Sequence, residues 1–208
     1  MAQPANILNQ NISIKRLQEM RNFGDEILTH GLKDKILKKF ISHDLNLRSA
    51  IESAYEHFLV LKKEKPDFLL LSEKEQIKLA QQNIVNFYAN ENVNPYVAIS
   101  AMGPWIVTLK GAVIYDCGGY GMLGLGHSPK LALNEIKKPH VMANVMTPSL
   151  SQMEFIDILK KEIGHSRTNK STFTEFCCLN SGSESVSIGA RLADVNAKEI
   201  TAKGAKHF

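Results

Sequence analysis

The 208-residue chain has few cysteines, and their spacing fits neither a disulfide framework nor a metal site. They are Cys117, Cys177 and Cys178; two are adjacent, and no Cys-x-x-Cys or clustered His pair occurs. A disulfide-stabilised fold needs several separated cysteines, and a zinc site needs paired Cys or His ligands at short spacing. We therefore expect a reduced, cytoplasmic protein with no metal site.

The chain also lacks a segment in which charge of one sign is concentrated. Lys+Arg minus Asp+Glu is 25 − 21 = +4 over the whole chain. Residues 1–90 carry 13 basic and 11 acidic side chains, and residues 91–208 carry 12 and 10, so each part has a net charge of +2. Proteins that bind nucleic acid or anionic membranes usually concentrate basic charge on one segment. We expect no nucleic-acid partner and no membrane partner.

No hydrophobic run is long enough to cross a bilayer. The longest uncharged stretch, Asn92–Leu109, is interrupted by Pro95, Gly103 and Pro104. A membrane helix needs about 20 predominantly apolar residues. The first ten residues lack the basic start and apolar core of a secretory signal. Neither a membrane span nor a secretory signal is expected.

Residues 1–91 predict an all-helical N-terminal segment. Apolar residues recur at helical spacing in four stripes: Ile14, Leu17, Phe23 and Ile27; Ile36, Leu37 and Phe40; Ile51, Tyr55, Phe58 and Leu59; and Ile77, Ala80, Ile84 and Phe87. We expect Gly31 to end the first and Pro66 to follow the third. Ser72 followed by Glu75 is a capping-box signature for the fourth. Such a segment is typical of a packing or partner-binding unit.

Residues 92–145 predict a hairpin followed by a glycine-rich loop. Trp105–Leu109 and Ala112–Cys117 are candidate strands on either side of a Lys110–Gly111 turn. Five glycines then fall within Gly118–Gly126, and Leu131–Ile136 is a candidate short helix.

Residues 146–208 predict α/β structure. Ser149 and Gln152 form another capping-box candidate, before a helix that extends to about Ile163. The apolar run Phe173–Leu179 predicts a buried strand, and a helix is expected from Glu184 to about Asn196. A strand, a tight turn and a helix make up half of a βαβ unit. We therefore expect the chain to be α/β, with this part as the start of a larger domain.

One glycine pattern in the loop has the form of a dinucleotide-binding turn. Gly119-Tyr120-Gly121-Met122-Leu123-Gly124 is a literal G-x-G-x-x-G after a candidate strand. In that motif the third glycine opens a helix and an acidic residue follows about 20 residues later. Here Leu125–Pro129 is irregular in pattern, and Pro139–Met153 contains no acidic residue. We interpret the match as accidental.

The turn between the last predicted strand and helix is a candidate anion site. It reads Asn180-Ser181-Gly182-Ser183-Glu184-Ser185. A helix N-terminus has unpaired N–H groups and a partial positive charge, and small residues let a phosphate approach closely. The same residue types also simply cap helices, so the residues alone leave anion binding and capping both open.

The glycine-rich loop carries two further candidates, Tyr120 and His127, which are placed to line a pocket together. A loop histidine more often bonds to nearby backbone, and Asp116 at the end of a strand is typical of a turn cap. Ser183, His127 and Asp116 could form a Ser-His-Asp set, but the sequence has no G-x-S-x-G elbow to support it.

Taken in order, four sequence blocks resemble class III, fold-type-I aminotransferases that use pyridoxal 5'-phosphate (PLP). The blocks are Tyr115-Asp116, Leu125-Gly126-His127-Ser128-Pro129, Ser149-Leu150-Ser151-Gln152 and Asn180 to Ser185. Two details depart from the family pattern, Ser185 in place of Ala and a shortened Gly-His-x-x-Pro spacing. The resemblance covers about residues 92–208 and does not explain residues 1–91.

The resemblance implies a fold, a cofactor and a set of site residues. Ser181, Gly182 and Ser183 would bind the PLP phosphate, and Tyr120 would face the substrate. Gly126 and His127 would shape the loop near a homodimer interface. The substrates would be an amine or amino acid and a 2-oxo acid.

The resemblance also implies that the chain is the N-terminal portion of such an enzyme. The Schiff-base lysine, a ring-stacking aromatic and the pyridine-pairing Asp would all follow Phe208, so no catalytic residue is assigned here and the chain alone should be inactive. The alternative is a non-catalytic helical binding or regulatory protein that carries a decayed transaminase remnant.

Overall fold

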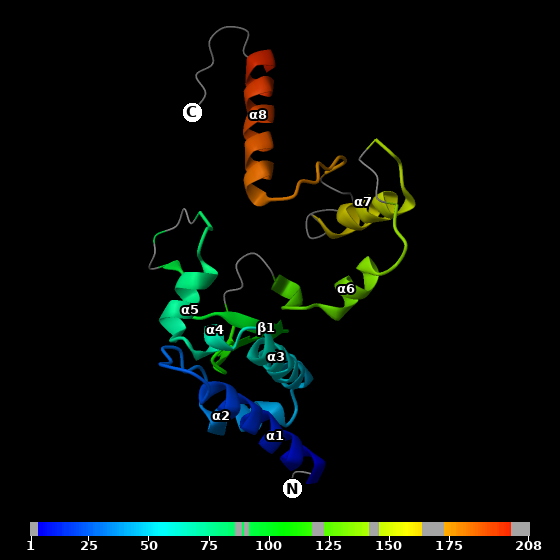
Figure 1. Cartoon of the computed structure of the whole chain (residues 1–208). Helices are drawn as coiled ribbons and strands as arrows, with labels where there is room; N and C mark the ends of the chain where they lie inside the picture. The colour runs from blue at the N-terminus through cyan, green and yellow to red at the C-terminus, as the bar shows by residue number, and fades with distance from the viewer. Residues whose placement is uncertain are drawn as a thin grey trace. The chain divides into compact units, whose positions relative to one another are not determined.

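The computed structural model describes residues 4–85, 89, 92–117, 123–141, 146–163 and 173–200. The chain divides into two compact units, Met1–Pro139 (unit 1) and His140–Phe208 (unit 2), and each is described by itself (Figure 1). The described residues form eight α-helices and one three-stranded antiparallel sheet. The chain is therefore of mixed α/β class.

Unit 1 holds the sheet and six of the helices described. In chain order its elements are α1 (Pro4–Arg21), α2 (Asp34–Ile41), α3 (Leu45–Glu64), α4 (Pro66–Leu70), α5 (Glu73–Ala80), β1 (Ala98–Met102), β2 (Trp105–Thr108), β3 (Val113–Tyr115), the 3-10 turn η2 (Leu123–Leu125) and α6 (Lys130–Ile136). Unit 2 holds α7 (Leu150–Glu162) and α8 (Gly182–Ile200).

The sheet has the order β1-β2-β3, with β2 at its centre. Strand β2 pairs antiparallel with β1 and with β3, its neighbours in the chain. In this register Ile106 of β2 lies opposite Ala101 of β1 and Ile114 of β3. The β2–β3 turn needs Gly111, whose φ of +71° is costly for other residues. The predicted hairpin is confirmed, whereas β1 was not predicted.

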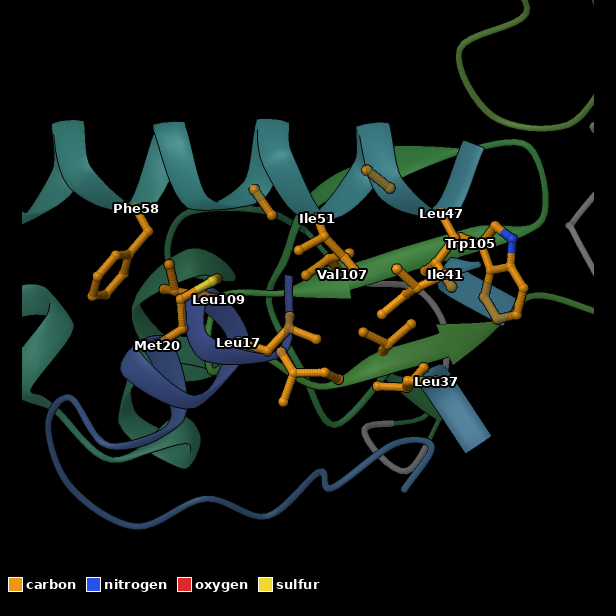
Figure 2. Close-up of a cluster of buried hydrophobic side chains, with 14 of the residues drawn as sticks. Leu17, Met20, Leu37, Ile41, Leu47, Ile51, Phe58, Trp105, Val107 and Leu109 are labelled. Atoms are coloured by element: carbon orange, nitrogen blue, oxygen red, sulfur yellow. The ribbon is translucent and has the colours of Figure 1, made fainter. Parts of the chain in front are cut away.

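One hydrophobic core joins the helices to the sheet. Helix α3 packs on β1 and β2, and α1 packs on α3. Figure 2 shows the buried side chains that fill this space: Leu17, Met20, Leu37, Ile41, Leu47, Ile51, Phe58, Trp105, Val107 and Leu109. The sequence placed a boundary near residue 91, but residues from both sides of it form this core, and the division into units follows Pro139.

Two helix starts show how local capping is combined with tertiary contacts. The Asp44 carboxylate accepts the N–H groups of Asn46 (2.9 Å) and Leu47 (3.1 Å) at the start of α3, and its other oxygen accepts the Trp105 indole N–H at 2.7 Å. Ser72 and Glu75 form the predicted capping box of α5. Both caps satisfy N–H groups that a helix start leaves unpaired.

Two predicted helix limits in unit 1 are wrong. The first stripe was expected to continue through Phe23 and Ile27, but α1 ends at Arg21, and a side chain at the following Gly24 would collide with the Leu69 carbonyl. The fourth was expected to continue through Ile84, but α5 ends at Ala80, and Asn83 has a left-handed φ of +67°. Phe87 lies outside the described residues.

Helix α4 was also missed. Pro66 follows the third helix as predicted, since α3 ends at Glu64, but it also begins α4, which the sequence did not predict. Proline is well suited to a first helical position, because that N–H has no partner within the helix in any case.

Unit 2 has no buried side chain among its described residues. Its helices begin near where the sequence predicts: Ser149 caps α7 by accepting the Gln152 N–H at 3.2 Å, and α8 begins at Gly182 rather than Glu184. The predicted strand Phe173–Leu179 is wrong, because the structure assigns no strand there. A strand is stable only when another strand pairs with its backbone, and no partner strand lies among the described residues of this unit.

The contact between Tyr55 and Glu19 makes the stability of unit 1 depend on pH. The Tyr55 hydroxyl of α3 donates to the Glu19 carboxylate of α1 at 2.6 Å, which lowers the pKa of Glu19 below its usual 4.5. We expect Tyr55→Phe to lower the free energy of unfolding by about 1 kcal/mol at pH 7. A carboxylate with a lowered pKa in the folded state stabilises it above its unfolded pKa, and this contribution disappears as the pH falls through the folded value. The loss should therefore shrink below about pH 4.

Urea unfolding followed by the fluorescence of Trp105, the single tryptophan and 1% exposed, measures this difference. An equal loss of stability at pH 7 and at about pH 3.5 would show that the hydrogen bond from Tyr55 does not lower the pKa of Glu19.

Candidate functional site

The predicted phosphate turn lies at the start of α8. Ser181 directly precedes the helix, and its hydroxyl oxygen accepts the Glu184 N–H at 3.2 Å. Its carbonyl accepts the Ser185 N–H at 3.1 Å, which closes the first turn. Both capping and an exposed helix N-terminus are therefore present at the same residues.

The turn has room for an anion. A side-chain Cβ built on Gly182 meets no atom within 4 Å, and Ser181 to Ser185 are all exposed. Within the described part of the chain, no hydrogen bond uses the N–H groups of Gly182 or Ser183. Two backbone donors at a positive helix end are thus available to one ligand.

The serine hydroxyls of this turn have different roles. Those of Ser185 and Ser187 donate to the carbonyls of Ser181 (3.1 Å) and Ser183 (3.0 Å), so they are used within the helix. The Ser183 hydroxyl makes no such bond in the described structure and can donate to a ligand. The Glu184 carboxylate accepts the Asn180 N–H at 3.0 Å. These donors fit a phosphate group.

Tyr120 lies outside the described residues, as do Gly119, Gly121 and Met122, so its predicted role stays a prediction. Gly124, the third glycine of the G-x-G-x-x-G pattern, lies in the 3-10 turn Leu123–Leu125. A dinucleotide motif requires that glycine at the start of an α-helix. The described end of the loop does not have that geometry.

His127 makes two contacts that the sequence did not predict, one with Asp116 and one with Gly103. Nε2 of His127 lies 3.0 Å from a carboxylate oxygen of Asp116, and both side chains are about four-fifths buried. His127 and Gly103 also exchange two backbone hydrogen bonds of 2.8 and 2.9 Å. A Cβ at Gly126 would lie 2.8 Å from the Gly103 Cα, so only glycine fits there.

His127 and Asp116 are therefore partners, which leaves the turn-cap interpretation of Asp116 incomplete. No local signal shows this contact, because the two residues are eleven apart and are brought together by backbone bonds of His127 to Gly103 and of Asp116 to Pro104. Ser183, the third member of the Ser-His-Asp set considered above, belongs to unit 2.

Neither a metal-binding cluster nor a membrane-spanning helix is found among the described residues. They contain no group of three or more His, Cys, Asp or Glu side chains placed to hold a metal ion. Among the helices that they form, none has the length and apolar character needed to cross a bilayer.

Comparisons with protein-family models, with curated proteins and with solved structures found no match to this chain.

Proposed function

We propose that this chain is the N-terminal portion of a class III, fold-type-I PLP-dependent aminotransferase. In this proposal Ser181, Gly182 and Ser183 bind the cofactor phosphate, and the intact protein moves an amino group from an amine or amino acid to a 2-oxo acid. The observation that carries the proposal is the open N-terminus of α8, where two backbone N–H groups and one hydroxyl have no partner in the described structure.

The charge of a phosphate group matches the partial positive charge of a helix N-terminus. A phosphate monoester carries close to two negative charges at neutral pH, and a helix N-terminus offers about half a positive charge with aligned N–H donors. Gly182 contributes an N–H and no side chain, so phosphate oxygens can approach the backbone closely. The Ser183 hydroxyl would add a third donor.

When bound, PLP would supply the reactive aldehyde and the electron-withdrawing ring that amino transfer requires. The residues of this chain would anchor and orient it through its phosphate. Tyr120 facing the substrate, and homodimer formation, belong to the same proposal.

The proposal predicts a specific preference for phosphorylated ligands. Pyridoxamine 5'-phosphate has no aldehyde and cannot react with surface lysines, so it reports binding alone. We expect it to bind at least about tenfold more tightly than pyridoxamine, because charge-assisted hydrogen bonds to the phosphate contribute about 1.5–3 kcal/mol each. Titration followed by the backbone amide NMR signals of Gly182 and Ser183 measures both affinities.

Gly182→Asp provides the test variant. It places a carboxylate where the phosphate would lie, yet an acidic residue in the first turn stabilises a helix. The preference for the phosphorylated ligand should therefore disappear without loss of α8. Gly189→Asp is the matched control, since Gly189 lies on the same helix and also has open space around it. Equal binding of the two ligands to the unmodified chain, or an unchanged preference in Gly182→Asp, would refute the proposal.

The alternative function is a helical binding or regulatory protein in which the transaminase-like part is a remnant. One observation favours it: the buried core described lies in unit 1, whereas the described residues of unit 2 bury no side chain. The same titration separates the two proposals, because a remnant has no reason to retain a phosphate preference.

A further inference from the structure

Unit 1 contains a cavity of about 420 Å³ beside the segment that leads into α2. Its wall combines two apolar side chains, Ile27 and Leu32, with the cationic Arg21 and Lys33. Pockets with apolar walls and a few converging polar groups are typical of small-molecule sites. The cavity lies far along the sequence from the phosphate turn and is independent of the proposed function.

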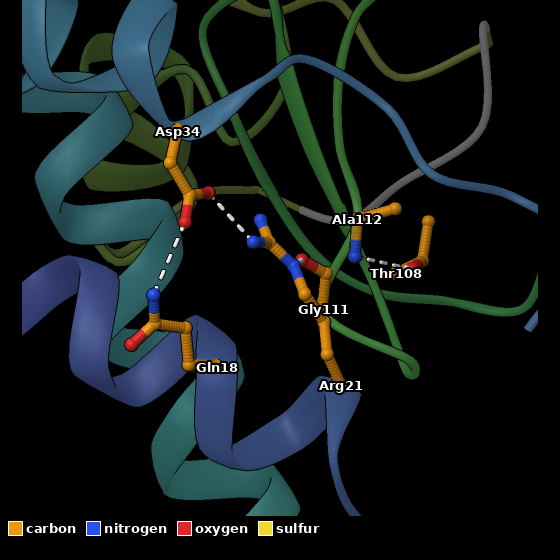
Figure 3. A network of polar contacts seen from close by, with 6 residues as sticks. All are labelled: Gln18, Arg21, Asp34, Thr108, Gly111 and Ala112. Atoms are coloured by element: carbon orange, nitrogen blue, oxygen red, sulfur yellow. Dashed lines mark hydrogen bonds and ion pairs between the residues drawn. The ribbon is translucent and has the colours of Figure 1, made fainter.

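Arg21 is held rigidly at this cavity. Its Nε donates to the Gly111 carbonyl at 2.9 Å, and its Nη1 donates to the Asp34 carboxylate at 2.6 Å (Figure 3). The second oxygen of Asp34 accepts the Gln18 amide at 3.3 Å. The guanidinium is thus fixed from two sides before any ligand arrives.

The third nitrogen of this guanidinium, Nη2, is buried and has no hydrogen-bond partner. A buried cationic donor almost always has an acceptor, whether protein, water or ligand. Arg21 is also one of the residues that line the cavity, so an acceptor that enters there and displaces part of the wall can reach Nη2. The segment from Ile27 to Lys33 contains no helix or strand, so a small shift there breaks no regular structure.

The charges around the cavity leave one cation uncompensated. Asp34 balances Arg21, but Lys33 is exposed and forms no ion pair within the described structure. Its side chain also makes no capping hydrogen bond to α2. A single carboxylate could therefore form an ion pair with Lys33 and accept a hydrogen bond from Nη2 of Arg21.

We propose that this cavity binds a small aliphatic monocarboxylate. The carboxylate oxygens would accept hydrogen bonds from Arg21 Nη2 and from the Lys33 ammonium. The short hydrocarbon part would lie against Ile27 and Leu32. Guanidinium and carboxylate match in geometry as well as in charge.

The test uses the full chain, isotopically labelled, and sodium isovalerate as the probe. We expect saturable changes of the Arg21 Nε–Hε signal and of the Leu32 and Lys33 amides, with a Kd on the order of millimolar. Lys33→Gln should weaken binding about fivefold, the size typical of one exposed charge pair. Lys35→Gln, two residues further along in the first turn of α2 and not part of the wall, should leave the affinity within about twofold.

Two reference ligands decide whether the charge is recognised. Isovaleramide has the same shape without the charge and should bind about tenfold more weakly. Sodium chloride at matched ionic strength should give no saturable change. The proposal is overturned if chloride reproduces the changes, if the amide binds as well as the acid, or if Lys33→Gln leaves the Kd unchanged.

Discussion

Replacing Phe58 by alanine is expected to lower the free energy of unfolding of unit 1 by about 3–5 kcal/mol. Phe58 is 1% exposed and lies at the junction of α3, α1 and the loop after α1. Its ring contacts that of Phe23 edge-on at 5.5 Å and stacks near Tyr55 at 6.1 Å. The substitution removes buried apolar area and leaves a cavity that the packed neighbours cannot fill.

The loss should appear in urea unfolding followed by Trp105 fluorescence. Val60→Ala on the same helix is the matched control, because Val60 is 49% exposed and its replacement should change stability by no more than about 0.5 kcal/mol. Similar losses in the two variants would mean that Phe58 does not belong to the core shown in Figure 2.

Glu73→Ala is expected to destabilise unit 1 by about 3 kcal/mol or more, although it changes a charged residue. The Glu73 side chain is 1% exposed, and one carboxylate oxygen accepts the N–H groups of Leu28 and Thr29, both at 2.7 Å. These bonds hold the irregular segment after α1 against the start of α5. Alanine would leave two backbone donors without their acceptor, which costs more than the bonds themselves contribute.

A second effect adds to this loss. Burial lowers the pKa of Lys110, and the charges of Glu73 and Asp25 oppose that shift. Lys110 is 2% exposed and donates to the carbonyls of Leu69 and Leu71 at 3.2 and 2.7 Å. Without Glu73, the pKa of Lys110 falls further and its buried charge is less well compensated.

Lys74→Ala, one residue further along the same helix and exposed, controls for changes in helix propensity. Glu73→Gln keeps an acceptor oxygen for both N–H groups but removes the charge, so it should lose less than alanine. A Glu73→Ala variant as stable as Lys74→Ala would contradict the role of Glu73 as the anchor of this segment. The measurement is again urea unfolding at pH 7.

The elements that the sequence predicted best are those fixed by neighbouring residues. The Ser72–Glu75 capping box, the Ser149 cap and the turn at Gly111 were all found where they were predicted. Each depends on contacts within a few residues, which a sequence pattern records directly.

The candidate phosphate turn is of the same local kind. Ser181, Gly182 and Ser183 were singled out as a small, polar helix start, and α8 does begin there. What a pattern does not record is which hydroxyl is free: Ser185 and Ser187 are engaged with backbone carbonyls of the same helix.

The sequence by itself determined the positions of most helices, the Ser72–Glu75 and Ser149 caps, the hairpin and the turn at α8, because short-range hydrogen bonding and apolar spacing define them. The tertiary structure decided the rest: the core shared by the helices and the sheet, the His127–Asp116 contact, the burial of Glu73 and Lys110, and the contacts of Arg21. Residues Phe173–Leu179, which were predicted to form a strand, form none in the structure. For each of these contacts the partner lies outside the local sequence, and the free energy of burying or pairing a group depends on that partner rather than on its neighbours in sequence.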